Sequence, residues 1–142
     1  MSQQLTASAE MVNQKVKFIG TSGSNPEITL DYTPPIGDGE GYTSLELFLV
    51  SLASCAGTSI ASLLRQMRKD VSGLKINVNG NRREQHPTGF EKIHMVIILK
   101  SKDALESDVK KAISLSEESI CPVWNMIKHN VEISNEYEIV RV

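Results

Sequence analysis

Two cysteines are the residues of this chain whose type and placement could support redox chemistry. Cys55 lies inside an apolar stretch, and Cys121 follows 66 positions later, directly before a proline. A cysteine thiolate attacks oxidants and other electrophiles, and a second thiol can trap the oxidised sulfur as a disulfide. A structural interpretation stays open for both, because a free cysteine often serves as a small buried hydrophobe or fills a helix junction.

The local surroundings of the two cysteines predict different acidities. Pro122 suits the first position of a helix, which places Cys121 at the N-cap. Unpaired amides and the helix dipole favour a thiolate there. Cys55 falls in the middle of a helical pattern, where its nearby polar groups are weak hydroxyl donors, those of Ser51, Thr58 and Ser59. From these features alone, Cys121 is expected to be the more acidic thiol.

Patterns for other kinds of site are missing from the sequence. Neither cysteine belongs to a Cys-x-x-Cys or paired zinc spacing, and the three histidines, His86, His94 and His129, are scattered. We therefore expect no metal site. The chain also shows no phosphate-binding loop, dinucleotide fingerprint or nucleophile elbow, so we expect no cofactor.

Length and composition predict one domain spanning residues 1–142. The chain is 40% hydrophobic and 23% charged, which is enough to bury a sizeable core. A net charge of −2 and an aromatic content of 5% offer no reason to expect nucleic acid as a partner. The N-terminus lacks the basic start and apolar run of a secretory signal, so we expect a cytoplasmic protein whose cysteines remain reduced.

Hydrophobic periodicity predicts an α+β fold with the element order βββ-α-ββ-α-α-β. The pattern indicates strands over residues 5–12, 15–20 and 27–32, a helix over 43–69, a strand over 74–79 paired as an antiparallel hairpin with 90–100, a helix over 103–120, a short helix from 122 to about 129, and a strand over 131–142. A loop containing two prolines and three glycines, residues 33–41, precedes the helix that carries Cys55.

The helix predicted over residues 43–69 is apolar nearly all round. Between Glu46 and Arg65 lie 18 uncharged residues, the lower limit of a membrane span. Seven of them are Ser, Thr, Gly or Cys, a polar content that favours a protein interior, so we expect no membrane association. Such a helix must be covered on several sides, and one small sheet covers only one. We therefore expect an intimate homodimer.

Two motifs carry a resemblance to a known family. The segment Gly-Tyr-Thr-Ser-Leu-Glu-Leu-Phe-Leu-Val-Ser-Leu-Ala-Ser-Cys, residues 41–55, and the segment Ser-Ile-Cys-Pro-Val, residues 119–123, resemble the helix-opening and Cys-Pro motifs of the OsmC/Ohr family. The element order and the cysteine separation are also similar, so the resemblance covers essentially the whole chain. It implies a swapped homodimer in which antiparallel sheets wrap two central helices, with active sites at the subunit interface.

The resemblance also implies a thiol-dependent peroxidase, an antioxidant oxidoreductase of the oxidative stress response. In such a reaction Cys55 reduces an organic or hydrogen peroxide and becomes a sulfenic acid. Cys121 then forms a disulfide with it, and a dithiol reductant reopens that disulfide. The resemblance thus assigns the attack to Cys55, although local features favour Cys121 as the thiolate.

The chain departs from the family pattern in two places. Peroxidase members supply an arginine from the first hairpin, whereas this chain has no arginine before Arg65 and offers only Lys15 and Lys17 near that turn. A lysine supplies charge without the bidentate fork of arginine. The Ohr branch places a glutamate where this chain has leucine, and Glu46 and Glu40 are the candidate substitutes.

These departures place the chain nearer to the OsmC-like branch than to the Ohr branch. A non-catalytic OsmC-like protein that binds a ligand or senses redox state therefore stays open as the alternative to an enzyme. A reaction of Cys55 with a non-peroxide electrophile would need a base that the sequence does not reveal.

Overall fold

The computed structural model describes residues 2–142 and has two compact units, one ending at Phe48 and the other beginning at Leu49. Its secondary structure follows the predicted order βββ-α-ββ-α-α-β, with a π-helical turn added between the last two helices. The α+β class is therefore confirmed. The expectation that residues 1–142 act as one domain stays a prediction.

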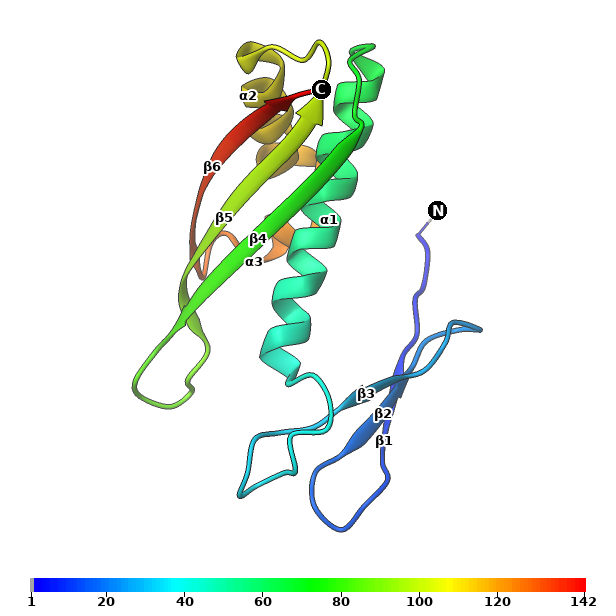
Figure 1. Ribbon diagram of the computed structural model, residues 1–142. Helices are drawn as coiled ribbons and strands as arrows, with labels where there is room; N and C mark the ends of the chain where they lie inside the picture. The colour runs from blue at the N-terminus through cyan, green and yellow to red at the C-terminus, as the bar shows by residue number, and fades with distance from the viewer. Residues whose placement is uncertain (1) are drawn as a thin grey trace. The chain divides into compact units, whose positions relative to one another are not determined.

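The first unit is built on a small antiparallel sheet (Figure 1). Its strands, shorter than the sequence predicts, are β1 (Ser8–Met11), β2 (Phe18–Thr21) and β3 (Ile28–Leu30), with β2 in the centre. After β3 the chain runs through the proline- and glycine-rich loop. It then returns beside the strand, where the Asp31 amide donates to the Tyr42 carbonyl at 2.9 Å.

Helix α1 (Ser44–Gln66) carries one apolar stripe that is fully buried within the chain. Its side chains recur every four residues, as expected of one helix face: Leu52, Ala56, Ile60 and Leu64. The helix ends three residues before the predicted boundary. Arg68 adopts a left-handed φ of 61° and its amide donates to the Arg65 carbonyl, so the chain reverses there.

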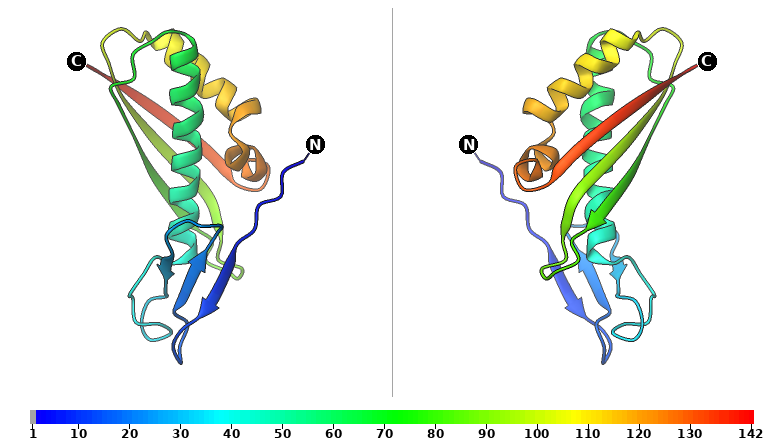
Figure 2. Two further views of the ribbon diagram at one scale, coloured as in Figure 1. Left: turned by 90° about the vertical axis from the view of Figure 1, so that its right-hand side faces the viewer. Right: turned by 90° about the vertical axis from the view of Figure 1, so that its left-hand side faces the viewer.

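The second unit contains a three-stranded sheet of β4 (Gly73–Arg82), β5 (Phe90–Ser101) and β6 (Glu132–Arg141), with β5 in the centre. The predicted hairpin of β4 and β5 is confirmed as an antiparallel pair. The predicted inward side chains of β5 are also confirmed as buried: Ile93, Met95, Ile97 and Leu99. The helices lie on one face of this sheet (Figures 1 and 2).

The pairing of β5 with β6 differs from the antiparallel sheets that the sequence resemblance implies. These two strands are parallel over ten residue pairs, from Lys92 with Glu132 to Ser101 with Arg141. Between them the chain passes through three helical segments, which return it to the starting end of β5. A crossover of this kind makes parallel pairing possible, whereas a tight turn would force an antiparallel pair.

The predicted helix over residues 103–120 is wrong in its extent. Helix α2 runs only over Glu106–Leu115, and a π-helical turn η1 covers Ser116–Ile120. The start is delayed because the Ser101 hydroxyl accepts the amides of Asp103 and Ala104 at 3.2 and 2.9 Å and holds them in a turn. Helix α3 (Pro122–Ile127) follows and stops two residues before the expected end.

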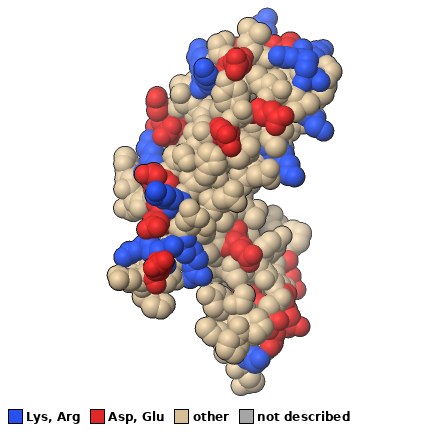
Figure 3. All heavy atoms as spheres, turned by 60° about the vertical axis from the view of Figure 1, so that its left-hand side comes forward, with Lys and Arg blue, Asp and Glu red and all other residues tan. Residues whose placement is uncertain are grey.

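Charged residues of both signs are interspersed on the face of the molecule that Figure 3 shows. Within residues 2–142, α1 is the single helix whose length and composition would suffice to cross a membrane. Only 28% of its most apolar window is buried within the chain. The core helix of a soluble protein can meet the same criterion of length and composition, so the absence of membrane association stays a prediction.

Candidate active site

Cys55 lies on α1 at the edge of the buried stripe. Its neighbours Leu52 and Ala56 are fully buried, while the Cys55 side chain itself is partly accessible. One helical turn later, Ser59 is again buried and its hydroxyl donates to the Cys55 carbonyl at 3.0 Å. The helix thus presents a thiol and a hydroxyl on adjacent positions of one face.

Cys121 lies at the junction of η1 and α3 and is completely buried. The predicted N-cap position is confirmed, because the Trp124 amide donates to the Cys121 sulfur at 3.5 Å and Pro122 occupies the first helical position. Its own amide donates back to the Ser116 carbonyl at 2.9 Å, which closes the π-helical turn. Cys121 is therefore held from both sides by backbone hydrogen bonds.

The fold brings the two cysteines together. The Cys55 thiol lies near enough to the Cys121 thiol to raise its pKa, and the nearby Ser59 hydroxyl lowers that pKa. Both cysteines are free thiols in this structure. Two thiols from distant parts of the sequence therefore lie in one region of the fold, and a disulfide between them requires Cα atoms within about 7 Å of each other.

The predicted acidity of Cys121 is wrong. Burial raises the pKa of the Cys121 thiol, because the charged thiolate loses the solvation that water would provide. The Trp124 amide opposes this rise, the neighbouring Cys55 adds to it, and the Ser59 hydroxyl again lowers the pKa, but burial dominates. A helix N-terminus lowers the pKa of a thiol and burial in apolar surroundings raises it, and at Cys121 the effect of burial is the larger.

Two further polar groups in this region are buried without a hydrogen-bond partner: the Ser116 hydroxyl, at the start of η1, and the indole nitrogen of Trp124. The sequence offered one signal for this segment, Pro122, which interrupts the helical pattern. It did not indicate the π-helical turn, because the periodicity of residues 103–120 continues through it. π-helical turns frequently accompany functional sites.

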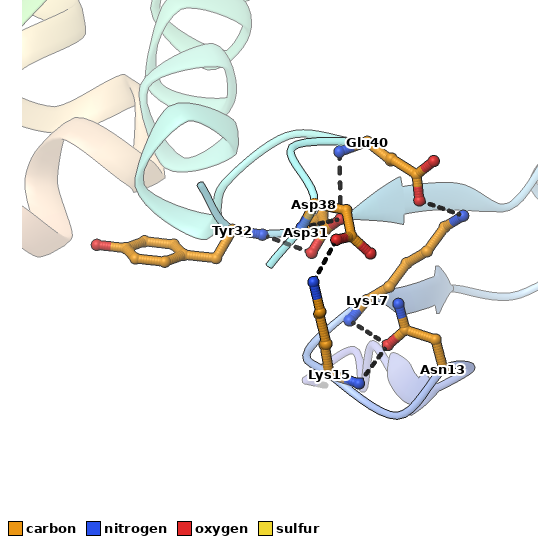
Figure 4. A network of polar contacts seen from close by, with 7 residues as sticks. All are labelled: Asn13, Lys15, Lys17, Asp31, Tyr32, Asp38 and Glu40. Atoms are coloured by element: carbon orange, nitrogen blue, oxygen red, sulfur yellow. Dashed lines mark hydrogen bonds and ion pairs between the residues drawn. The ribbon is translucent and has the colours of Figure 1, made fainter. Parts of the chain in front are cut away.

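Three of the candidate auxiliary residues belong to a polar cluster of the first unit (Figure 4). The Lys15 ammonium contacts the Asp38 carboxylate at 2.6 Å, and Lys17 contacts Glu40 at 3.3 Å. The hydrogen bond and charge of Asp38 raise the pKa of Lys15. Both lysines are thus already paired with carboxylates of the loop before α1.

Asp31 organises the same loop. Burial would raise the pKa of this carboxyl, but hydrogen bonds from the amides of Tyr32, Glu40 and Asp38 outweigh it and hold the pKa below its usual value. Gly37 is required here, since a side chain would collide with the Tyr32 carbonyl and the Asp31 carboxylate.

The carboxylate oxygens of Asp31, Asp38 and Glu40 lie within 4.8 Å of one another, a spacing that a metal ion could use. Backbone amides already donate hydrogen bonds to Asp31, and the two lysines already form ion pairs with Asp38 and Glu40.

Glu46, the fourth candidate auxiliary residue, serves the start of α1. Its carboxylate accepts the Thr43 amide at 3.0 Å, and the Thr43 hydroxyl accepts the Glu46 amide at 3.2 Å. This reciprocal pair is a capping box. The bond from the Thr43 amide lowers the pKa of Glu46. The motif Thr-Ser-Leu-Glu, residues 43–46, was a visible sequence signal for this role.

Known proteins are similar to this chain in sequence and in fold. The model of the family described as OsmC-like protein matches residues 37–136. Protein YhfA of Escherichia coli is 30% identical over 123 residues, covering 87% of this chain and 90% of YhfA. A hypothetical protein from Aquifex aeolicus superimposes with a TM-score of 0.82 at 30% identity, covering 99% of this chain and 100% of that one.

Two further solved structures share the fold at lower identity. The OsmC like protein from Mycoplasma pneumoniae has a TM-score of 0.84 at 22% identity, covering 99% of this chain and 100% of its own. The organic hydroperoxide resistance protein OsmC from Legionella pneumophila has a TM-score of 0.70 at 16% identity, covering 99% and 98%. The family match, which spans more than half of the chain, and the identity to YhfA lead to one conclusion: this chain belongs to the OsmC-like protein family.

Proposed function

We propose that this protein reduces organic or hydrogen peroxide with its two thiols and thereby acts as a cytoplasmic antioxidant enzyme. The observation that carries the proposal is that the fold places the Cys55 thiol near the Cys121 thiol, 66 positions away in the sequence. The name of the Legionella relative, an organic hydroperoxide resistance protein, supports peroxide as the oxidant.

The reaction would proceed in three balanced steps. The Cys55 thiolate attacks the terminal oxygen of the peroxide, the O–O bond breaks, and an alcohol or water leaves after taking up a proton. The Cys121 thiol then attacks the Cys55 sulfenic acid, which forms the S–S bond and releases water. A dithiol reductant finally reduces this disulfide through a mixed disulfide and is itself oxidised.

The different burial of the two cysteines supports attack by Cys55 and disulfide formation by Cys121. Cys121 is fully buried and its raised pKa keeps it a protonated thiol near neutral pH, so it is a poor first nucleophile. Cys55 is partly accessible and is the sulfur that a small peroxide could approach. Cys55 is therefore assigned the attack and Cys121 the trapping of its oxidised form.

We also propose which groups supply the positive charge that would stabilise a Cys55 thiolate. Lys15 and Lys17 are the candidates, and each would have to leave its present carboxylate, Asp38 or Glu40, to serve a thiolate. Exposed ion pairs of this kind are weak, so such an exchange is energetically feasible.

The proposed assembly is a homodimer formed over the apolar side of α1 that the chain leaves uncovered. A groove there is lined by small and apolar side chains of α1 and β4, among them Val50, Ala53, Gly57, Ala61, Leu74 and Ile76. Val50 is 50% exposed in the single chain.

Placing a charge there with Val50→Glu should produce monomers in sedimentation analysis. Met126→Glu, at an exposed apolar position of α3, should leave the dimer intact. A monomeric unmodified chain would contradict this part of the proposal.

The test of the activity is peroxide consumption by the purified protein with a dithiol reductant. We expect turnover of cumene hydroperoxide or hydrogen peroxide by the natural chain and none by Cys55→Ser. Cys121→Ser should consume about one peroxide per chain and then stop with a sulfenic acid that dimedone traps. Unchanged turnover in Cys55→Ser, or no consumption by the natural chain with any dithiol, would refute the proposal.

The missing arginine favours one alternative, a redox-sensing or binding protein that is not a catalyst. The first arginine of this chain is Arg65, so the first hairpin has no guanidinium group that could stabilise a thiolate. A protein of this kind would form the Cys55–Cys121 disulfide reversibly but would show no peroxide turnover, and the same assay distinguishes the two functions.

A further inference from the structure

The two cysteines differ in how a thiol from another molecule could reach them. Cys121 has an exposed fraction of 0%. Its amide donates to the Ser116 carbonyl at 2.9 Å, and its sulfur accepts the Trp124 amide at 3.5 Å, so the backbone holds this residue on both sides. Association with a second chain can only add cover to such a residue. Access to the Cys121 sulfur therefore requires a local opening of the fold.

Cys55 keeps accessible surface on α1. Ser51, one helical turn earlier on the same face, is exposed to solvent. The groove assigned to the dimer is lined on α1 by side chains such as Val50, Gly57 and Ala61, and Cys55 is not one of the lining residues. At about 100° per residue, Cys55 points to a different side of the helix from these three. A partner that covers the groove therefore does not have to cover Cys55.

Reduction of a disulfide begins when a thiolate attacks one of the two sulfurs, and its rate depends on access and on the leaving group. The attacked sulfur enters a mixed disulfide, and the other sulfur leaves as a thiolate. The raised pKa of Cys121 slows its departure, because a less acidic thiol is a poorer leaving group. The Trp124 amide offsets part of this effect, since it already donates to the Cys121 sulfur. Access decides between the two sulfurs, because a thiolate excluded from Cys121 cannot react there.

We propose that the reductant attacks Cys55 and not Cys121, so that one accessible sulfur receives both the peroxide oxygen and the reducing thiol. The inference rests on the proposed two-thiol function. The reductant thiolate forms a bond to the Cys55 sulfur, the Cys55–Cys121 bond breaks, and Cys121 leaves as a thiolate that takes up a proton. The second thiol of the reductant then attacks the reductant sulfur of the mixed disulfide. Cys55 is released as a thiolate, and the reductant leaves as a disulfide.

The first test identifies the attacked sulfur in the natural chain and needs no peroxide. Diamide forms the internal disulfide, and 2-mercaptoethanol then forms a mixed disulfide that lacks a second thiol to remove it. Stopping the reaction early with N-ethylmaleimide in urea labels the sulfur that has left. Mass spectrometry of the digested chain should find mercaptoethanol on Cys55 and N-ethylmaleimide on Cys121. Mercaptoethanol on Cys121, in equal or greater amount, would overturn the inference.

The second test hinders the approach to one cysteine at a time. Ser51→Tyr places a bulky side chain one helical turn from Cys55 on the same face. Ser119→Tyr is the matched control, because Ser119 is also an exposed serine and lies two residues before Cys121. Reduction of the diamide-formed disulfide by dithiothreitol should be roughly tenfold slower in Ser51→Tyr. It should keep its natural rate in Ser119→Tyr. A slowing in Ser119→Tyr alone would overturn the inference.

The results separate this inference from the proposed function. If mercaptoethanol is found on Cys55 but the natural chain consumes no peroxide, then the proposed function is wrong and the assignment of the attacked sulfur stands. If peroxide is consumed and mercaptoethanol is found on Cys121, then the proposed function stands and the assignment is wrong. A natural chain that forms no internal disulfide with diamide would overturn both.

Discussion

The start of α1 offers a sharp test of whether Glu46 stabilises the helix or takes part in the reaction. Thr43 and Glu46 exchange two hydrogen bonds, at 3.0 and 3.2 Å, that satisfy amides at the helix N-terminus. Thr43→Ala removes the hydroxyl acceptor and leaves the Glu46 carboxylate in place. The helix that carries Cys55 is therefore loosened at its first turn without touching either cysteine.

The expected loss can be worked out from these contacts. Replacing an N-cap threonine by alanine costs about 1 kcal/mol, within a range of roughly 0.5–2 kcal/mol. For a chain of this length such a loss lowers the melting temperature by roughly 2–5 °C. The two residues share one pair of bonds, so Thr43→Ala combined with Glu46→Ala should cost less than the sum of the single changes.

The pH dependence of the same contact has a definite sign. The Thr43 amide lowers the pKa of Glu46, so the stabilisation is present above the ordinary pKa of 4.5 and is lost as pH falls through the lowered value. Urea unfolding of the natural chain should show this loss. Glu46→Gln should show a smaller dependence, because its side chain does not ionise.

The assay combines urea unfolding with peroxide turnover well below the melting temperature. We expect Thr43→Ala to lower the free energy of unfolding and to leave the turnover unchanged. Glu46→Gln should also lower the free energy of unfolding and retain its turnover. A Glu46→Gln protein with unchanged stability and strongly reduced turnover would refute the capping interpretation and would assign Glu46 to the reaction.

Three other outcomes follow from the structure. Burial raises the pKa of Cys121 above the ordinary 9.0. The stability gained by burying the neutral thiol is therefore present below pH 9.0 and declines as pH rises through the raised value. Urea unfolding of the natural chain should show this decline at alkaline pH, and Cys121→Ser should lack it. Trp124 is the one tryptophan of the chain and its amide caps Cys121, so its fluorescence should change when diamide oxidises the natural chain and should stay constant in Cys55→Ser. Leu52→Ala should lower the free energy of unfolding by about 2–5 kcal/mol, because this side chain is fully buried, whereas the matched change at Leu105, 56% exposed, should cost roughly 0.5 kcal/mol or less.

Local patterns in the sequence were sufficient for the order of the elements. Alternation marked the inward side chains of β5, and spacings of three and four marked α1, because these periods depend on residues close in sequence. Pro122 indicated the N-cap position of Cys121 for the same reason: a proline determines the backbone of its own and the preceding residue. The resemblance that joined Cys55 and Cys121 also rested on two short local motifs.

Only the tertiary structure decided what surrounds the two sulfurs. The burial of Cys121, which reverses its expected acidity, places it near Cys55 and Ser59 of α1, which lie 66 and 62 positions away in the sequence. The parallel pairing of β6 with β5 and the π-helical turn before Cys121 depend in the same way on how the elements meet. A sequence pattern records which residues can be buried, while solvation and hydrogen bonding depend on neighbours that only the folded chain brings together.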